Sequence, residues 1–499
     1  MTKAEQEVRS KQKGVKKKRA WAVLLFTNDQ QLATLHAYHA RFAIVHSIGY
    51  AHMLKDKIQA LKDKFGGALL SGSVIMLVST TVVNAGNYLY NLILGRWLGP
   101  ADFSDLSLIV TLMLMVTFVT VTLQMTAAKF AAAYSADDAD NSEQMGIALR
   151  RWLNKWAWRL GIGIGLLLAL GAPVWQSFFR TASPWPFVIL GVGIPVYFVQ
   201  GIDRGVLQGE IQFNKLALSY QAEMWARLGA GLLLVALGFS VGGATVGITL
   251  SFVATWLVAR AALKKDNAEE STATLDDTQK QAVKAFAWPV IIANVSQILI
   301  NNSDILIVKR FFEAEEAGRY AALALIGRIV FFATWSVVVT LFPIVAQRHQ
   351  KGETHRQLLW AGLGMVAAAS LVIVAFTVFI PEWIVNILFG QEYLTIAPLL
   401  WLYAIATMLY SLANVVINYR LSADETFGTT IAVVGGLAQV IGLWLFHATL
   451  RQVVITQIII MSGLLIALLI WDSWLTVRQV ANISGDHKTT INYGNQELT

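Results

Sequence analysis

The sequence predicts an all-α integral membrane protein, with about twelve transmembrane helices in two pseudo-symmetric six-helix bundles. Three observations support this fold class. Of the 499 residues, 56% are hydrophobic and 14% are charged, whereas soluble domains carry about 25% charged residues. Apolar windows of roughly 20 residues, long enough to cross a bilayer as a helix, recur along the chain. The second half of the chain also repeats features of the first half.

Twelve apolar windows have the length of a membrane-spanning helix, and we number them as spans 1 to 12. They lie near residues 68–95, 104–132, 156–178, 184–203, 216–238, 242–262, 288–309, 319–345, 358–379, 395–418, 428–448 and 452–475. With the polar segments between them, they divide the chain into an amphipathic, basic N-terminal extension (1–66), an N-lobe with spans 1–6 (67–263), an acidic linker (264–284), a C-lobe with spans 7–12 (285–480) and a tail (481–499).

The distribution of lysine and arginine predicts the orientation of the spans. If both termini are cytoplasmic, the outer loops hold only a few of the 39 basic residues, namely Arg96, Arg180, Lys309, Arg310, Arg319 and Arg451. The extension, linker and tail are then cytoplasmic, and the chain is expected to be a multi-pass protein of the cell (cytoplasmic) membrane. The strongly basic segment 1–20 is expected to contact anionic membrane lipids and not nucleic acid.

The composition excludes several chemistries. The chain has no cysteine, so it has no disulfide, thiol catalyst or cysteine metal site. Four of its eight histidines lie in the extension without paired carboxylates, at His36, His39, His46 and His52. A solvated helix face explains them better than a metal site. There is also no phosphate-binding P-loop pattern, so we predict no metal and no cofactor.

An internal repeat relates the two lobes. A shift of 214 residues aligns Asn87 with Asn301 and Arg96 with Arg310, and the same register holds without a gap across four helices and their loops. The shift pairs span 1 with span 7, span 2 with span 8 and span 4 with span 10. Because six helices return the chain to its starting side, the lobes should be related by an axis along the membrane normal.

Two of the paired spans carry a polar stripe. In span 7 the polar residues Asn294, Gln297, Asn301 and Asp304 are spaced by three, four and three, and in span 1 Asn84, Asn87 and Asn91 also share one helical face. Unsatisfied polar groups facing lipid cost several kcal/mol each. Both stripes must therefore face protein or a water-filled cavity, as in transporters.

Besides Asp304, four charged candidate site residues lie inside predicted spans. Lys129 lies in span 2, Glu223 and Arg227 lie in span 5, and Arg328 lies in span 8. One interpretation is structural: Glu223 and Arg227 pair at i, i+4, and Lys129 extends to the inner surface. The functional interpretation is that the three cations project into a central cavity and bind an anionic head group. Arginine suits phosphate because its planar fork binds two oxygen atoms.

Asp304 has no basic residue three or four positions away on its own helix. Burial favours its neutral form, so Asp304 could carry a proton, bind a cation or pair with an arginine such as Arg328. Glu223 is a second candidate for such a titrating, coupling group. Coupling of transport to H⁺ or Na⁺ stays open at this point.

Two segments resemble a known family. The segment NYLYNLILGRWLGPADFSDLSLIVTL (87–112) resembles the first loop of bacterial polysaccharide transporters, the lipid-linked oligosaccharide flippases. The segment NNSDILIVKRFFEAEEAGRYAALALIGRI (301–329) resembles the corresponding part of the second half. The resemblance covers roughly residues 66–480 and extends to the multidrug/oligosaccharidyl-lipid/polysaccharide exporter superfamily. It implies two six-helix bundles in a V around a central cavity.

The resemblance also implies a substrate and a site. Members of the family move undecaprenyl-diphosphate-linked glycans from the inner to the outer leaflet. In the lipid II flippase branch, arginines on spans 2 and 8 engage the diphosphate. Arg328 lies on span 8, so the resemblance implies this role for it, whereas span 2 offers only Lys129.

The leading hypothesis is therefore a non-enzymatic flippase for a lipid-linked oligosaccharide that uses alternating access. Its partners would be the polyprenyl-diphosphate-linked glycan and polysaccharide assembly proteins. A cation-coupled multidrug extruder of the same fold is an alternative, which a cationic cavity disfavours because the usual substrates are cations. A membrane-embedded glycan polymerase or ligase is another, but the longest outer loop, about 380–394, holds only Glu382 and Glu392 as acids.

Overall fold

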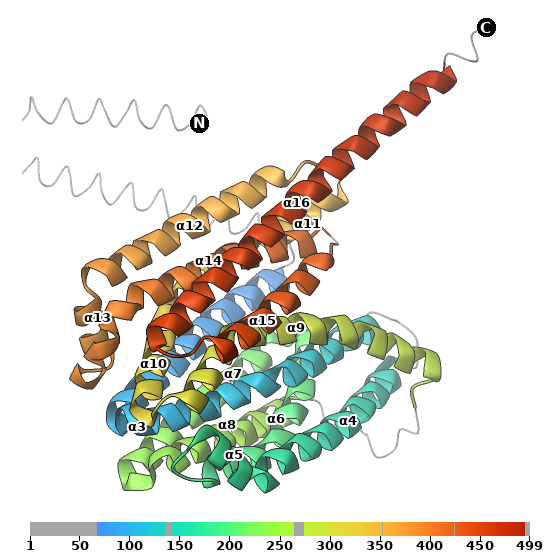
Figure 1. Ribbon diagram of the computed structural model, residues 1–499. Helices are drawn as coiled ribbons and strands as arrows, with labels where there is room; N and C mark the ends of the chain where they lie inside the picture. Colours follow the sequence, from blue (N-terminus) through green and yellow to red (C-terminus); the bar gives the residue numbers. More distant parts are fainter. Residues whose placement is uncertain (1–66, 136–141, 264–273, 352, 424, 495–499) are drawn as a thin grey trace, which may run out of the picture. The chain divides into compact units, whose positions relative to one another are not determined.

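The structure is a computed structural model that describes residues 67–135, 142–263, 274–351, 353–423 and 425–494 (Figure 1). The predicted amphipathic extension, with its basic segment and four histidines, lies outside the described residues, as does most of the predicted linker. Residues from Ile75 onward form one compact unit, and the sites below belong to this unit. In the part of the chain that is described, all regular elements are helices.

The helices follow the predicted order of spans (Figure 1). The N-lobe contains α3 (Gly67–Ser135), α4 (Ser142–Leu170), α5 (Ala172–Phe179), α6 (Trp185–Gly209), α7 (Phe213–Leu234), the π-helix η1 (Val235–Phe239) and α8 (Ser240–Ala262). The C-lobe contains α9 (Asp277–Phe311), α10 (Ala314–Gly327), α11 (Ile329–Gln350), α12 (Arg356–Phe379), α13 (Pro381–Leu388), the 3₁₀-helix η2 (Gln391–Leu399), α14 (Leu400–Leu421), α15 (Phe427–Leu445) and α16 (Leu450–Gly494).

The described helices accommodate all twelve predicted spans. By length and composition, nine of the described helical segments could cross a membrane. Two of them, with 61 and 50 residues, are too long for one crossing. The first breaks at Gly99, where φ is 71°, and the second at Gly238, where φ is 90°, and each break separates two predicted spans. Span 3 corresponds to α4 and α5, which are bent by 61°.

The packing of the helices repeats between the lobes. In the N-lobe, α4 packs on α6, α6 on α8, and α7 on α8. The equivalent pairs in the C-lobe are α12 with α14, α14 with α16, and α15 with α16, and all three are also in contact. The repeat seen in the sequence therefore corresponds to a repeat in helix packing, which confirms the two pseudo-symmetric bundles.

Two helix boundaries differ from the predicted ones. Helix α9 begins at Asp277, inside the predicted linker, because Asp276 forms a capping box: its carboxylate accepts from the Gln279 backbone N–H at 2.7 Å, and the Gln279 side chain accepts from the Asp276 N–H at 3.0 Å. Helix α16 runs on to Gly494, into the segment predicted as a tail. Hydropathy marks where a helix leaves the bilayer, whereas capping decides where the helix ends.

Candidate functional site

A cavity of about 600 Å³ lies between the two lobes. Helices α3 and α7 of the N-lobe and α9, α10 and α11 of the C-lobe form its wall. Most of the wall is apolar, and its polar side chains are Asn84, Asn87, Tyr88, Asn91, Ser107, Thr111, Arg227 and Arg328. Each lobe therefore contributes one guanidinium group to a space inside the membrane-spanning region.

The polar stripe of span 1 lies in this wall. Asn84, Asn87 and Asn91 all line the cavity. The Asn91 amide donates to the backbone carbonyl of Asn87 at 2.9 Å, and Asn87 Oδ1 accepts from Arg227 Nη1 at 3.2 Å. The predicted stripe thus faces the cavity and holds the N-lobe arginine.

Arg227 belongs to a buried ionic cluster. Its Nη2 lies 2.6 Å from Glu223 Oε1, so the i, i+4 pair expected from the sequence is present. Glu223 Oε2 lies 2.8 Å from Nη1 of a second arginine, Arg204 on α6. Arg204 also donates to Ser219 Oγ and the Ser219 carbonyl at 3.1 and 3.0 Å, and its guanidinium lies 4.0 Å from the ring centroid of Tyr220.

Arg204 was not among the site residues predicted from the sequence. Predicted span 4 ended at residue 203, which left Arg204 outside the apolar window. Helix α6 continues to Gly209, so Arg204 lies inside the bundle and is only 4% exposed. The available signal was the charged dipeptide Asp203-Arg204 directly after an apolar run, followed by the polar stripe of span 5.

On the C-lobe side, Arg328 lies at the junction between α10 and α11. Its Nη2 donates to Asp304 Oδ1 at 3.2 Å and to the backbone carbonyl of Asn301. Asp304 Oδ2 accepts from the hydroxyls of Tyr403 and Tyr320 at 2.8 and 3.1 Å. Asp304 is 1% exposed. Of the three roles considered for it from the sequence (proton carrier, cation ligand or partner of an arginine), the structure contains the pair with Arg328.

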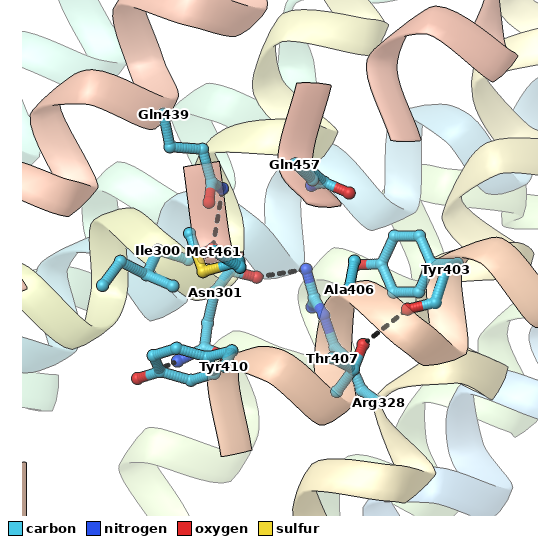
Figure 2. A pocket seen from close by; sticks show the side chains of 10 residues that line it. All are labelled: Ile300, Asn301, Arg328, Tyr403, Ala406, Thr407, Tyr410, Gln439, Gln457 and Met461. Carbon is cyan, nitrogen blue, oxygen red and sulfur yellow. Dashed lines mark hydrogen bonds between the residues drawn. The ribbon is translucent and has the colours of Figure 1, made fainter. Parts of the chain in front are cut away.

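Arg328 also lines a second, much smaller pocket of about 30 Å³ inside the C-lobe (Figure 2). The polar members of its wall are Asn301, Tyr403, Thr407, Tyr410, Gln439 and Gln457. A polar pocket of this size has room for water. Figure 2 shows the Arg328 guanidinium pointing at the Asn301 carbonyl, and Arg328 lines both the small pocket and the large cavity.

The stripe of span 7 does not face the large cavity, contrary to the cavity role predicted for its amides. Asn301 Nδ2 donates to the Tyr410 hydroxyl at 3.3 Å, and Gln297 Nε2 donates to Asn414 Oδ1 at 3.3 Å. Asn294 Nδ2 donates to the Val290 carbonyl within its own helix at 2.8 Å. Helix α14 therefore covers this face from inside the C-lobe. Periodicity shows which residues share a face, but not which element covers it.

Lys129 also lies away from the cavity wall. Its ammonium group is 4.0 Å from the ring centroid of Phe286 on α9 and 5.7 Å from that of Phe130. The side chain is exposed, because the last turns of α3 extend past the cavity. Lys129 therefore holds a cation–π contact between the lobes, and the expected projection of this residue into the cavity is wrong.

The lobes are joined beside the helix breaks that follow spans 1 and 7. Lys309, which the orientation analysis placed in an outer loop, is 2% exposed. Its ammonium group lies 2.6 Å from Asp105 Oδ1 and 2.6 Å from Ser104 Oγ, both on α3 of the other lobe. At Gly318 a Cβ atom would stand only 1.7 Å from the Pro100 carbonyl oxygen. The lobes thus meet here through a buried ion pair and direct backbone contact.

In the described residues, no group of three or more His, Asp or Glu side chains is arranged to hold a metal ion. The hydrogen-bonding and ionic groups of the cavity instead suit an organic ligand that carries negative charge. The two guanidinium groups supply donors for oxyanions, and the three asparagines supply donors and acceptors for hydroxyl groups.

Comparisons with known proteins agree with this architecture. A family model described as polysaccharide biosynthesis protein matches residues 69–349. No curated protein matches the chain. Among solved structures, the chain is similar to a multidrug resistance MATE family transporter of the MOP superfamily in its inward-facing conformation. The TM-score is 0.66 at 15% identity, over 77% of this chain and 93% of that chain.

Two further solved structures share the fold. Lipid II flippase MurJ in an inward closed conformation matches with a TM-score of 0.62 at 13% identity, over 79% of this chain and 87% of that chain. A MATE family transporter in its outward-facing conformation matches with a TM-score of 0.57 at 16% identity, over 80% and 94% of the two chains. At these identities the similarity concerns the fold alone.

Proposed function

This chain belongs to the polysaccharide biosynthesis protein family, and on that premise we propose that it is a flippase for a lipid-linked oligosaccharide. The substrate is an undecaprenyl-diphosphate-linked glycan, which the protein carries from the inner to the outer leaflet by alternating access. The fold that the chain shares with a lipid II flippase and with MATE transporters supports transport as the activity. No bond of the substrate is made or broken in this proposal.

One observation carries the proposal: an arginine from each lobe lines the same intramembrane cavity. A charged side chain in the membrane costs at least ~2.5–3.5 kcal/mol. Each of the two arginines has a carboxylate partner, Glu223 or Asp304, and still borders the cavity, where it can bind an oxyanion. A diphosphate has enough oxygen atoms for both guanidinium forks. The same cations disfavour a multidrug extruder whose substrates are cationic.

The neutral polar groups of the wall support the glycan part of the substrate. Asn84, Asn87 and Asn91 follow one another along α3 at the cavity. Each amide both donates and accepts hydrogen bonds, as sugar hydroxyls do. The apolar part of the wall, which includes Val110, Leu114 and Leu325, would contact the first isoprene units of the lipid carrier.

Alternating access requires the lobes to separate at one end while they close at the other. The contact between Lys309 and Asp105 must then break in the state that opens there. We place this end at the outer membrane surface, as the distribution of lysine and arginine predicts.

Asp304 is the proposed coupling group. Its carboxylate pairs with Arg328 and also accepts hydrogen bonds from the hydroxyls of Tyr403 and Tyr320. When a phosphate draws Arg328 into the cavity, Asp304 loses its counter-ion in a buried site. A proton or Na⁺ taken up there compensates the charge, and so links substrate binding to an ion gradient.

The test is a flipping assay in proteoliposomes with a polyprenyl-diphosphate-linked glycan. Arg328→Ala should abolish flipping, and Arg328→Lys should recover only part of it because the bidentate fork is lost. Arg319→Ala is the matched control: Arg319 lies on α10, the helix that ends just before Arg328, but it pairs with Glu315 outside the cavity. Full flipping by Arg328→Ala would remove the diphosphate from this site.

The membrane and the orientation are part of the proposal. We assign the chain to the cytoplasmic membrane with both termini in the cytoplasm. Reporter fusions after Gln479 and between Asp266 and Asp277 should both be active only on the cytoplasmic side. A linker reporter that is active only outside the cell would overturn the orientation.

A further inference from the structure

We propose that Arg204, which does not line the cavity, is the residue that makes Arg227 an anion-binding group. By holding one oxygen of Glu223, Arg204 leaves Arg227 with a positive charge that no protein carboxylate fully compensates. The N-lobe cluster is then a preformed site for a phosphate or diphosphate. The identity of this anion as the lipid carrier's diphosphate rests on the proposed function, whereas the anion site itself does not.

The first argument is the charge of the cluster. Glu223 divides its two oxygen atoms between two arginines, with Oε1 on Arg227 at 2.6 Å and Oε2 on Arg204 at 2.8 Å. The other groups that hydrogen-bond these arginines, Asn87 and Ser219, are neutral. Two guanidinium groups and one carboxylate have a net charge of +1. A buried surplus charge of this kind is costly unless an anion joins it.

Arg227 also has a hydrogen-bond donor, its Nε, that no described protein group satisfies. Arg227 is 8% exposed and lines the cavity. Its Nε is buried and has no hydrogen-bond partner among the groups that the structure describes. Leaving a donor of a charged group unpaired is costly in a buried site. In the described part of the chain, one donor of a cavity-lining arginine is thus left without a partner, and a small movement of the Arg227 side chain would present this N–H to an oxyanion in the cavity.

Arg204 differs from Arg227 in this respect. Its Nε and Nη2 donate to Ser219, its Nη1 lies on Glu223, and Tyr220 covers its plane. Arg204 thus has partners on every side and does not reach the large cavity. It acts on the ligand only through Glu223, which makes it a positioning residue.

The C-lobe arginine is compensated. Arg328 pairs with Asp304, and Asp304 has no second cation among its contacts in the described residues. This pair is neutral, whereas the N-lobe cluster carries the surplus charge. An incoming anion is therefore attracted first to Arg227, and Arg328 joins after it has left Asp304.

The experiment measures anion affinity as the net charge of the cluster is changed. The probes are inorganic pyrophosphate and geranyl diphosphate, titrated into the full-length protein in nanodiscs at low salt. Geraniol serves as the uncharged control ligand. Arg204→Gln lowers the cluster charge to zero, Glu223→Gln raises it to +2, and the double variant returns it to +1. Folding is monitored for each variant by thermal unfolding.

Affinity for both anions should follow this charge. Arg204→Gln should weaken binding at least tenfold, because one unit charge at roughly 10 Å and an effective dielectric constant near 20 changes affinity by more than about tenfold for each charge on the ligand. Glu223→Gln should strengthen binding by a similar factor, and the double variant should return to wild-type affinity. Geraniol binding should not change. Arg319→Gln, which removes a cation outside the cavity, should leave all three affinities unchanged.

A purely structural role for Arg204 gives a different pattern. Glu223→Gln would then weaken binding, and the double variant would be no better than either single variant. That result overturns the inference, as does a folded Arg204→Gln protein with unchanged anion affinity. If Arg204→Gln does not fold, comparison of Glu223→Gln with the double variant still isolates the charge of Arg204.

The same data separate this inference from the proposed function. Anion affinity that follows the cluster charge in a protein without flipping activity would support the anion site and contradict the flippase. Flipping that is lost in Arg328→Ala, together with anion affinity that ignores the cluster charge, would support the flippase and refute the role of Arg204.

Discussion

Substitution of Asp304 by asparagine should destabilise the C-lobe strongly, although the two side chains have the same shape. The carboxylate is 1% exposed and accepts from Arg328, Tyr320 and Tyr403. An asparagine carries an NH₂ group in place of one oxygen. In one orientation this NH₂ faces the arginine, and in the other it faces two tyrosine hydroxyls. In the first orientation a donor meets a donor, and in the second the tyrosine hydroxyls must turn and accept from the NH₂ group. In both, Arg328 keeps its charge without a counter-ion.

The magnitude follows from this geometry. Removal of one partner of a buried ion pair typically costs about 3–5 kcal/mol, and the lost charge-assisted hydrogen bonds account for about 1.5–3 kcal/mol each. We expect Asp304→Asn to lower the free energy of unfolding by about 3–5 kcal/mol. Arg328→Gln should cost a similar amount, because it leaves the carboxylate unpaired. The double variant places one neutral amide against another and should recover most of the loss.

The assay is a double-mutant cycle, with the free energy of unfolding of all four proteins measured in the same mixed micelles. Glu315→Gln is the control: it breaks the exposed pair with Arg319 on α10 and should cost less than about 1 kcal/mol. Transport by the same four proteins is measured with and without an ion gradient. If Asp304→Asn keeps wild-type stability and unchanged gradient dependence, both the structural and the coupling role of Asp304 are refuted.

Three further predictions concern the contact between the lobes and the loop before α12. Lys309→Met should destabilise the closed contact, because it leaves a buried carboxylate without its cation; spin labels placed on either side of it in the cysteine-free chain should report a larger separation. Gly318→Ala should slow transport, since its Cβ cannot fit 1.7 Å from the Pro100 carbonyl oxygen and the lobes cannot close fully. Burial, the adjacent histidine and nearby arginines lower the pKa of His355. Its neutral form therefore contributes stability that is fully present above the ordinary histidine pKa near 6.5 and is lost as pH falls through the lowered pKa. Thermal stability should fall on acidification, and it should fall less in His355→Gln.

Each of these predictions has a matched control. Gly364→Ala adds the same methyl group on α12, where nothing lies within 4 Å, and should transport normally. Equal slowing by both alanine variants would refute the close contact at Gly318. An unchanged label separation in Lys309→Met would show that the ion pair does not hold the lobes together. The same acid sensitivity in wild type and His355→Gln would place the titrating group elsewhere.

The spans and their order could be predicted because they depend on local quantities. A window of roughly 20 apolar residues must cross the bilayer as a helix whatever surrounds it. The stripe of Asn84, Asn87 and Asn91 was also predictable, since helical spacing alone puts them on one face. The repeat between the lobes followed from matched positions such as Asn87 and Asn301, and the helix packing agrees with it.

The composition of the site was less predictable, because it depends on contacts between distant segments. Tyr403 carries no local mark of a role, and Arg204 carries only its charge at the end of an apolar run. The role of each became visible only when Asp304 and Glu223 were placed beside them. The burial of Lys309 likewise depends on Asp105, which precedes it by some two hundred residues in the other lobe.

The sequence by itself determined the membrane class, the number of spans, the two-lobe repeat and the family of this protein, because hydropathy, length and spacing act along the chain. Only the tertiary structure decided where the charges act. It turned the stripe of α9 toward α14 and away from the cavity, paired Arg328 with Asp304, and divided Glu223 between two arginines. The physical reason is that the ion pairs and hydrogen bonds of a buried charge depend on its neighbours, and in a helical bundle those neighbours come from other helices.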